Sequence, residues 1–491
     1  MGAGFGGIGA AVRLLQSGQE DFAVLERSDQ LGGVWRDNRY PGCRCDVPSH
    51  LYSFSFAPNP RWRSTHAERE EVWQYLQDTA TTFGVPTHIR FGHAVLEAGW
   101  DDRAGIWILR TNRGSLRCRY LISATGTLSE PMVPSIPGTE TFDGTIMHSA
   151  RWDPNHHFEG KRVAIVGTGA SAMQIVPSIQ PQVEHLTVFQ RTPGWVVPHH
   201  PRFIPSWKHR LFEHLPATQR LLRGVLYLRQ ELAVSAFTKY DGIRTGLERR
   251  ARRHLARQVA DPWLRAQLTP EYQLGCKRVP PSDDFYPAIS QSNVELVTEP
   301  IVRIEPDGMV TRDGHLHPVD TIVFATGFRV SDNPTARQVV GRESHRLSEA
   351  LSGDLPSYLG TTLPWFPNFF MLNGPNTGTG HTSQLYMIES QLNYIIDALE
   401  HLDEWDAVGE VLEDVAKEHS EEMQRRSAKS VWGSGCASWY RNDRDANVVI
   451  WPNYTFVFRR RSRHFDPADY RIVPAGSVAS PPTRPANERK D

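Results

Sequence analysis

Short apolar runs separated by glycine-rich turns dominate the pattern of hydrophobic and polar positions. Residues 162–166 and 185–189 are two such runs, with the length and β-branched content of buried parallel strands. Between them lie a glycine turn and a segment, 172–179, with helical character that Pro177 is expected to end early. Strand, glycine turn, helix and strand together make one βαβ unit.

Two further apolar runs end in the same tripeptide. Residues 120–126 and 320–327 each close on Ala-Thr-Gly, and such a turn brings backbone close to a ligand at the carboxyl edge of an open sheet. Because the motif occurs twice, we expect two crossing points between one nucleotide-binding domain and another inserted into it. The predicted fold class is α/β, with two Rossmann-like dinucleotide-binding domains. Residues 1–150 and 325–473 form the first, discontinuous domain, and residues 151–324 form the inserted one.

The inserted domain is expected to contain a helical subdomain at about 200–262, a segment rich in Arg, Leu and Trp. Within it, four apolar residues recur every four positions, and five arginines lie between them. The apolar residues are Leu247, Ala251, Leu255 and Val259, and the arginines are Arg249, Arg250, Arg252, Arg253 and Arg257. This spacing is typical of a surface helix with a solvated basic face. The last stretch, 474–491, lacks periodicity and is predicted to be disordered.

Composition and charge exclude several classes of partner. The chain has 54 Lys and Arg against 55 Asp and Glu, so no global field attracts nucleic acid. No apolar run approaches the roughly 20 residues of an integral membrane segment, and the first residues lack the basic region of a secretion signal. Nothing in the pattern indicates an oligomeric state. The few, scattered cysteines indicate reduced thiols, a cytoplasmic location and no metal site: Cys43, Cys45, Cys118, Cys276 and Cys436.

The first glycine turn lies at the very start of the chain, over residues 2–7. Glycines allow a tight turn and let a pyrophosphate approach backbone N–H groups at a helix N-terminus. Glu26 ends the apolar run 22–25, about 20 residues further on, where a carboxylate holds the ribose hydroxyls of a dinucleotide. Gly2, Gly4, Gly7 and Glu26 are therefore candidate ligands for the adenosine part of FAD.

The second glycine turn follows the run 162–166. At the end of the next strand, where an NAD-binding domain has a carboxylate, this chain has Arg191 and Thr192. An arginine in that place accommodates a 2′-phosphate, so the second nucleotide is expected to be NADPH. The candidate ligands are Gly167, Thr168, Gly169, Ala170, Ser171, Arg191 and Thr192.

The first turn lacks a preceding strand, because only Met1 stands before Gly2. A buried central strand of about 5–6 residues is expected there, and each buried Val or Ile contributes about 1.5–3 kcal/mol. Losing several would remove an amount comparable to a domain stability of about 5–15 kcal/mol. We therefore expect the natural chain to start upstream, with a short run rich in Val and Ile.

A third motif stands between the two turns, with Phe142, Gly144, His148 and Trp152 at fixed spacing and Asp153 after them. With it, the chain resembles the Baeyer–Villiger monooxygenases that carry FAD and NADPH on one polypeptide, the class B flavoprotein monooxygenases. The resemblance covers nearly the whole chain. Residues 374–383 are closer to the hydroxyacetophenone-type branch of that family, which points to aryl or long-chain ketones as substrates.

The resemblance implies that two loops lie beside the flavin. Residues 32–35 are similar to a turn that contacts the flavin, and residues 40–52 are similar to a loop that passes along its isoalloxazine ring. In that loop, Asp46 would be an active-site carboxylate and Tyr52 would touch FAD. The implied flavin-side residues are Gly33, Val34, Trp35, Arg44, Cys45, Asp46 and Tyr52.

The resemblance also implies the chemistry and its candidate catalytic residues, Arg278 and Asp46. Lys277 would contact the ribose phosphate region of NADP, Arg278 would sit over the flavin, and Trp439 would close on the nicotinamide from a mobile loop. One oxygen atom of O2 would be inserted next to a ketone carbonyl, through a flavin C4a-peroxide, to give an ester or lactone. A guanidinium stays protonated and offers donors in a fixed fork, and Asp46 would pair with it and hold its orientation.

Three alternatives remain open. A flavin-containing monooxygenase that oxygenates nitrogen or sulfur would share both glycine turns. A disulfide reductase of the same broad fold would need a redox cysteine pair near the flavin, where Cys43 and Cys45 have the wrong spacing. A non-enzymatic remnant unable to hold FAD would follow from the missing first strand. The motif over 142–153 and the pair Lys277 and Arg278 favour ketone oxygenation.

Overall fold

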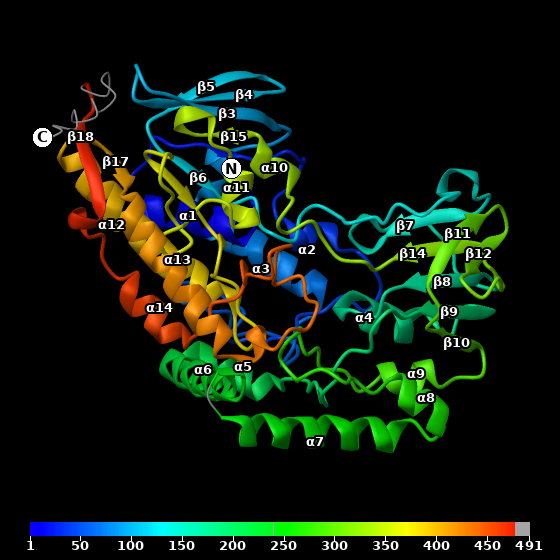
Figure 1. The fold of residues 1–491 in the computed structure, drawn as a ribbon. Helices are drawn as coiled ribbons and strands as arrows, with labels where there is room; N and C mark the ends of the chain where they lie inside the picture. Colours follow the sequence, from blue (N-terminus) through cyan, green and yellow to red (C-terminus); the bar gives the residue numbers. More distant parts are fainter. Residues whose placement is uncertain (239, 477–491) are drawn as a thin grey trace, which may run out of the picture.

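The computed structural model describes residues 1–238 and 240–476. Figure 1 shows a larger lobe on the left, a smaller sheet-containing lobe on the right, and a group of helices below them. Within these residues, no helix is long and apolar enough to cross a membrane.

A five-stranded parallel sheet, in the order β10-β9-β8-β14-β7, forms the smaller lobe. Its strands are β7 (Thr145–His148), β8 (Arg162–Val166), β9 (His185–Phe189), β10 (Val294–Val297) and β14 (Thr321–Phe324). An antiparallel sheet of β11 (Ile301–Glu305), β12 (Gly308–Thr311) and β13 (Leu316–Pro318) lies beside it (Figure 1). Strand β7 falls within the predicted first domain, yet it pairs with β14 in this sheet. The domain boundaries themselves stay a prediction.

The predicted βαβ unit is present as β8, α4 (Ala170–Ile179) and β9. The expected early end of the helix at Pro177 is wrong, because α4 continues to Ile179. Pro177 lies in the last turn, where its missing N–H removes only one hydrogen bond. Ile175, Val176 and Ile179 are buried and hold that turn against the sheet.

Helix α1 (Phe5–Gln16) packs against the long helix α12 (Gln384–Glu404) at the centre of the larger lobe (Figure 1). Two short parallel strand pairs accompany them: β1 (Val24–Leu25) with β2 (Ile89–Arg90), and β6 (Leu121–Ser123) with β16 (Phe369–Met371). Met1 lies beside β6, since its amino group donates to the carbonyl oxygen of Ile122 at 2.7 Å. On the other side, the N–H of Gly2 donates to the carbonyl oxygen of Leu25 at 2.8 Å.

The rest of the larger lobe surrounds this centre. An antiparallel sheet contains β3 (Val95–Asp101), β4 (Ile106–Thr111) and β5 (Gly114–Cys118), with β15 (Val339–Val340) parallel to β3. Strand β17 (Ala407–Val411) pairs with β18 (Tyr470–Pro474). Its remaining helices are α2 (Val34–Asp37), α3 (Arg69–Thr82), α10 (Pro334–Arg337), α11 (Leu347–Ser352), α13 (Glu413–Ala428) and α14 (Thr455–Arg461).

The tail predicted to be disordered covers residues 474–491. Residues 477–491 of it lie outside the described part of the structure. Its first residue, Pro474, instead ends β18 and pairs with Ala407 of β17.

The predicted helical subdomain contains α5 (Ser206–His214), α6 (Pro216–Thr238) and α7 (Asp241–Gln258). Helix α7 confirms the four-residue periodicity: Ala251 and Leu255 are buried, and the arginines predicted on the polar face are exposed. Two short helices follow, α8 (Pro262–Gln267) and α9 (Phe285–Ile289). Figure 1 shows α7 along the lower edge of the molecule, where α6 packs against it.

The expectation that all five cysteines are reduced thiols is wrong for two of them. Cys276 and Cys436 form a disulfide, with their Cα atoms 6.4 Å apart. Cys43, Cys45 and Cys118 are free. The paired cysteines are 160 residues apart in sequence, so only the fold reveals that they meet.

Candidate active site

A cavity of about 1620 Å³ is lined by residues of both lobes. Every candidate site residue inferred from the sequence lies on its wall except Gly7. Those on the wall are Gly2, Gly4, Glu26, Gly33, Val34, Trp35, Arg44, Cys45, Asp46, Tyr52, Gly167, Thr168, Gly169, Ala170, Ser171, Arg191, Thr192, Lys277, Arg278 and Trp439. The fold therefore brings together residues spread over more than 400 positions of sequence.

The two glycine turns are built in the same way. A Cβ at Gly2 would lie 2.7 Å from the carbonyl oxygen of Ala124, and one at Gly167 would lie 2.7 Å from that of Ala325. Both glycines also have positive φ, +95° and +110°, which other residues rarely adopt. Ala124 and Ala325 each begin one of the two Ala-Thr-Gly turns. Each dinucleotide turn therefore packs closely against one Ala-Thr-Gly turn.

The second glycine of each turn faces open space. Gly4 and Gly169 are the N-caps of α1 and α4, and neither helix has an acidic residue in its first turn. A Cβ at Gly169 would meet nothing within 4 Å, and one at Gly4 would meet only backbone of Gly33, at 3.6 Å. Two helix N-termini with unpaired N–H groups thus open on the cavity, as two pyrophosphates require.

Gly7 lies off the cavity wall and packs within its own turn. A Cβ on Gly7 would lie 1.8 Å from the carbonyl oxygen of Gly2. The absence of a side chain lets α1 close onto its own turn, which is the role of the third glycine in such a fingerprint.

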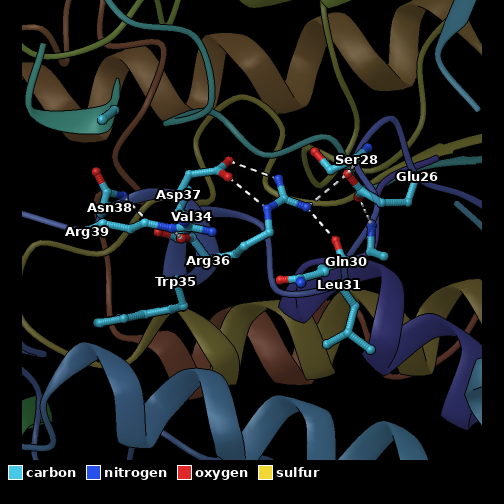
Figure 2. Close-up of polar contacts among 12 residues, drawn as sticks. Glu26, Ser28, Gln30, Leu31, Val34, Trp35, Arg36, Asp37, Asn38 and Arg39 are labelled. Carbon is cyan, nitrogen blue, oxygen red and sulfur yellow. Dashed lines mark hydrogen bonds and ion pairs between the residues drawn. The ribbon is translucent and has the colours of Figure 1, made fainter. Parts of the chain in front are cut away.

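Glu26 is buried behind the first turn, and three donors hold its carboxylate (Figure 2). The N–H of Ala3 donates to Oε2 at 2.8 Å, while the N–H of Ser28 and Nη1 of Arg36 donate to Oε1 at 3.0 and 3.2 Å. A carboxylate has about four acceptor positions, so room remains for a ribose hydroxyl. The donor set fits an adenosine site.

Sequence reasoning missed Arg36, the buried residue at the centre of Figure 2. Its Nε and Nη2 donate to the two carboxylate oxygens of Asp37 at 2.8 and 3.1 Å, and Nη1 donates to the carbonyl oxygen of Gln30 at 2.5 Å. Burial opposes the charge of Arg36, yet Asp37 and Glu26 raise its pKa. The available signal was a charged pair, Arg36 and Asp37, directly after the flavin-side turn.

Arg278 and Asp46 form an ion pair that crosses from one lobe to the other. Nε of Arg278 donates to Oδ2 of Asp46 at 2.8 Å, and Nη2 donates to Oδ1 at 2.6 Å. Asp46 raises the pKa of Arg278 against the effect of burial, so the guanidinium keeps its charge. The Arg278 side chain is 37% exposed, and that exposure faces the cavity that it lines. The two bonds to Asp46 leave Nη1 available to a ligand.

The loop that carries Asp46 is attached to the helix of the second turn. Gln174 of α4 accepts a hydrogen bond from the hydroxyl of Tyr40 at 3.0 Å, and its amide donates to the carbonyl oxygen of Arg44 at 3.1 Å. Gly42 has φ +79°, and a Cβ there would lie 2.6 Å from the carbonyl oxygen of Gln174. The loop that carries Asp46 is therefore placed relative to the helix of the NADP-side turn by direct contact. Sequence reasoning also missed Gln174, a polar residue in a mostly apolar helix.

Aromatic side chains line the flavin side of the cavity. Nε1 of Trp35 donates to the hydroxyl of Tyr52 at 3.0 Å, and Phe5 packs edge-on against Tyr52 with ring centroids 5.3 Å apart. Burial raises the pKa of Tyr52 and of the neighbouring Cys45, so both stay neutral. These uncharged aromatic side chains give their part of the wall an apolar surface, which suits a flat aromatic ring.

Positive charge gathers on the NADP side. Arg191 is exposed at the end of β9, and the hydroxyl of Thr168 donates to the carbonyl oxygen of Thr192 at 3.2 Å. Lys277 lies over the ring of Tyr272, with Nζ 4.8 Å from its centroid. Burial, and then Arg191, lower the pKa of Lys277. The effect of Arg191 on Lys277 shows that these two cations lie near each other, an arrangement that suits a phosphate monoester.

The residues of the third motif lie in the smaller lobe and are not among those that line the cavity. His148 ends β7 and is buried, and its Nδ1 accepts from the N–H of Ala150 at 3.1 Å. Burial lowers the pKa of His148 to about 4, so the ring is neutral. Trp152 stacks on Phe158 with centroids 5.2 Å apart. These contacts hold residues 148–158 against the smaller lobe.

Three comparisons with known proteins agree with this geometry. Residues 1–221 match the family model described as pyridine nucleotide-disulphide oxidoreductase. A Baeyer–Villiger monooxygenase from Streptomyces coelicolor is 46% identical, over 96% of this chain and 92% of its own. Two solved structures are also similar to this chain, each with a TM-score of 0.86 over 96% of this chain and 98% of its own. One is cyclohexanone monooxygenase from Rhodococcus sp. Phi1 bound to NADP+, which is 26% identical. The other is OTEMO in complex with FAD and NADP, which is 25% identical. The chain belongs to the Baeyer–Villiger monooxygenases.

Proposed function

We propose that this chain is an FAD- and NADPH-dependent monooxygenase that inserts one oxygen atom of O2 next to a ketone carbonyl, and that Arg278 is its oxygen-transfer residue. The observation that carries the proposal is the bidentate pair of Arg278 and Asp46 on the wall of a cavity that both glycine turns also line. Family membership supplies the reaction class.

The residues fit both cofactors. The turn around Gly4, with Glu26 behind it, would hold the FAD diphosphate and ribose. The turn around Gly169, with Arg191 and Lys277, would hold NADPH. Bound FAD, once reduced by NADPH, would react with O2. The inserted oxygen atom would come from that O2.

Arg278 stabilises negative charge on oxygen during the transfer. Its guanidinium is already charged and oriented before substrate binds, so it needs no reorganisation when charge develops. Nη1 offers hydrogen-bond donors to a carbonyl oxygen or to the attacking oxygen.

Asp46 acts through Arg278 and is a positioning residue. Its two oxygens hold Nε and Nη2 in one plane, which fixes the direction of the remaining nitrogen. The carboxylate also offsets the cost of placing a guanidinium in the cavity wall.

The residues 374–383 favour aryl or long-chain ketones as substrates, and this substrate class is part of the proposal. Purified protein would be mixed with NADPH, ¹⁸O2 and a panel of aryl, long-chain and cyclic ketones, with amines and sulfides included. We expect esters carrying one ¹⁸O atom, with the highest rates for aryl or long-chain ketones. Oxygenated amines or sulfides without any ester would overturn the proposal in favour of nitrogen or sulfur oxygenation.

The cytoplasmic location remains a prediction, and the Cys276–Cys436 disulfide removes part of its basis. Cell fractionation with an antibody against the protein would test it.

A further inference from the structure

A disulfide joins the segment that carries Arg278 to the loop that carries Trp439. Cys276 directly precedes Lys277, and Cys436 lies three residues before Trp439. The Cα atoms of the two cysteines are 6.4 Å apart, within the range of about 4.4–6.8 Å that a disulfide spans. The bond therefore ties two parts of the cavity wall together.

The two ends of this bond sit in very different surroundings. Cys276 is buried, and the neighbouring Gly275 packs so closely on Phe237 of α6 that a Cβ would lie 2.4 Å from its ring. Cys436 lies in residues 434–454, which form no helix and no strand beyond isolated bridges. Gly435, just before it, has φ +84° and open space around it. The disulfide thus links the irregular loop 434–454 to the closely packed segment that contains Cys276.

Small molecules can reach the pair from the Cys436 end. Cys436 is half-buried rather than sealed, and the hydroxyl of Ser434 lies 3.6 Å from the sulfur of Cys276. A cavity of about 370 Å³, lined in part by Gln273 and Ser434, lies on this side. Thiols exchange and oxidise where they are exposed in this way.

We propose that Cys276 and Cys436 form a redox site that hydrogen peroxide closes and a dithiol reductant opens, with the closed form holding the Trp439 loop against the active site. The oxidant rests on the proposed function, because a monooxygenase that turns over NADPH and O2 without a ketone releases hydrogen peroxide.

The chemistry of closing balances with one peroxide per disulfide. One thiolate attacks a peroxide oxygen, the O–O bond breaks, and the departing hydroxide takes a proton to become water. The second thiol attacks the resulting sulfenic sulfur, the S–O bond breaks, and a second water leaves. Two thiols lose two electrons, and one peroxide becomes two waters. A dithiol reverses the change and becomes a disulfide itself.

The closed form slows exchange of the nicotinamide nucleotide. Trp439 and Lys277 line the same cavity, and the bond at Cys436 prevents the intervening chain from lifting away. Loops that must open for product release often limit turnover. Peroxide made in the absence of ketone therefore closes the site and reduces further consumption of NADPH.

The first test measures formation of the disulfide and protease cleavage of the loop, and it does not depend on enzyme activity. The holoenzyme is reduced with dithiothreitol, freed of it, and treated with hydrogen peroxide; peptides are then mapped without reduction. We expect a linked peptide containing Cys276 and Cys436, and slower trypsin cleavage after Arg444, which is exposed in the loop. Thiols that stay free under peroxide, or cleavage rates equal in the two forms, would overturn the proposal.

The second test follows NADPH consumption without ketone. We expect the rate of the reduced enzyme to fall by roughly threefold or more as peroxide accumulates, and catalase to prevent the fall. Cys436→Ser and Cys276→Ala should each abolish it, whereas Cys118→Ser, at a free thiol in β5, should not. A fall that persists in both cysteine variants contradicts the proposal. In the separate assay with ketones, failure to form any ester would refute the proposed function; the peptide map and the cleavage rates do not depend on that result.

Discussion

Two arginine–carboxylate sites lie on the wall of the same cavity and differ in how many donors they leave unused. Arg36 is buried, and all three of its nitrogens donate, to Asp37, Glu26 and the carbonyl oxygen of Gln30. Arg278 gives two nitrogens to Asp46 and turns a side chain 37% exposed toward the cavity. At the first site every guanidinium nitrogen already donates a hydrogen bond, and we call this guanidinium saturated. At the second site one nitrogen, Nη1, has no partner among the described contacts of Arg278.

Whether a guanidinium has an unused nitrogen distinguishes an arginine that holds a cofactor site together from one that can act on a substrate. A saturated guanidinium can only fix its neighbours, here the carboxylate of Glu26 behind the first glycine turn. A guanidinium with an unused nitrogen can meet charge that appears during a reaction. An arginine–carboxylate pair in a cavity is therefore not by itself a sign of catalysis.

The largest expected effect follows removal of the unsaturated guanidinium. Arg278→Ala should lower the rate of ester formation by on the order of 10²–10³, while FAD content stays at the wild-type level. Ester formation is measured by mass spectrometry under saturating NADPH, and FAD content by absorbance. Arg278→Lys keeps the charge without the fork, and should recover only part of the rate. Full recovery by lysine would show that the fork geometry is dispensable.

Removal of the saturated guanidinium should affect stability and FAD binding instead. Arg36→Ala leaves Glu26 with two donors and Asp37 without its partner, and should lower the free energy of unfolding by about 1.5–3 kcal/mol. Thermal unfolding and FAD titration measure the change. The ester formed per NADPH by FAD-loaded Arg36→Ala should equal that of the wild type. A drop in this ratio comparable to that of Arg278→Ala would erase the distinction between the two sites.

A smaller effect is expected at the NADP side, where Arg191 is exposed at the end of β9. Arg191→Ala should raise the KM for NADPH by roughly tenfold, the loss of one charged hydrogen bond, and leave that for NADH nearly unchanged. Arg303→Ala, in β11 of the same lobe and absent from the cavity wall, is the matched control. Equal increases for both coenzymes would show that Arg191 does not contact the 2′-phosphate.

The smallest effect should come from the orienting carboxylate. Asp46→Asn keeps the shape of the side chain but loses its charge, so the guanidinium is held less firmly. We expect about fivefold slower ester formation, or about 1 kcal/mol, with hydrogen peroxide rising in proportion. Stopped-flow reduction by NADPH should be nearly unchanged. A loss larger than that of Arg278→Ala would mean that Asp46 contacts the reacting atoms itself.

The sequence was sufficient for the parts of the fold that depend on local spacing. The βαβ unit, the two glycine turns and the periodicity of α7 each follow from residues close together in the chain. Helix α4 ran past Pro177 because tertiary packing outweighs one missing hydrogen bond. Strand β7 lies within the predicted first domain but pairs with β14 of the parallel sheet, and the sequence did not indicate this pairing because four residues at a sheet edge carry little signal.

In the site, too, residues in local motifs could be predicted from the sequence, whereas residues that act through distant partners could not. Residues 2–7, 26 and 167–171 could be chosen from motif spacing, and all but Gly7 line the cavity. Arg36 and Gln174 could not, because their importance lies in partners that only the fold supplies. The link between Cys276 and Cys436 spans 160 residues and carries no local pattern.

The most direct test of the central claim is a single-turnover partition experiment on Arg278→Ala. The FAD-loaded variant is reduced with one equivalent of NADPH and mixed with O2 and a ketone that the wild type converts; ester and hydrogen peroxide are then quantified. We predict that nearly all of the electrons leave Arg278→Ala as hydrogen peroxide, while the wild type and Arg36→Ala give mostly ester. Ester at the wild-type yield per NADPH from Arg278→Ala would contradict the assignment of Arg278 as the oxygen-transfer residue.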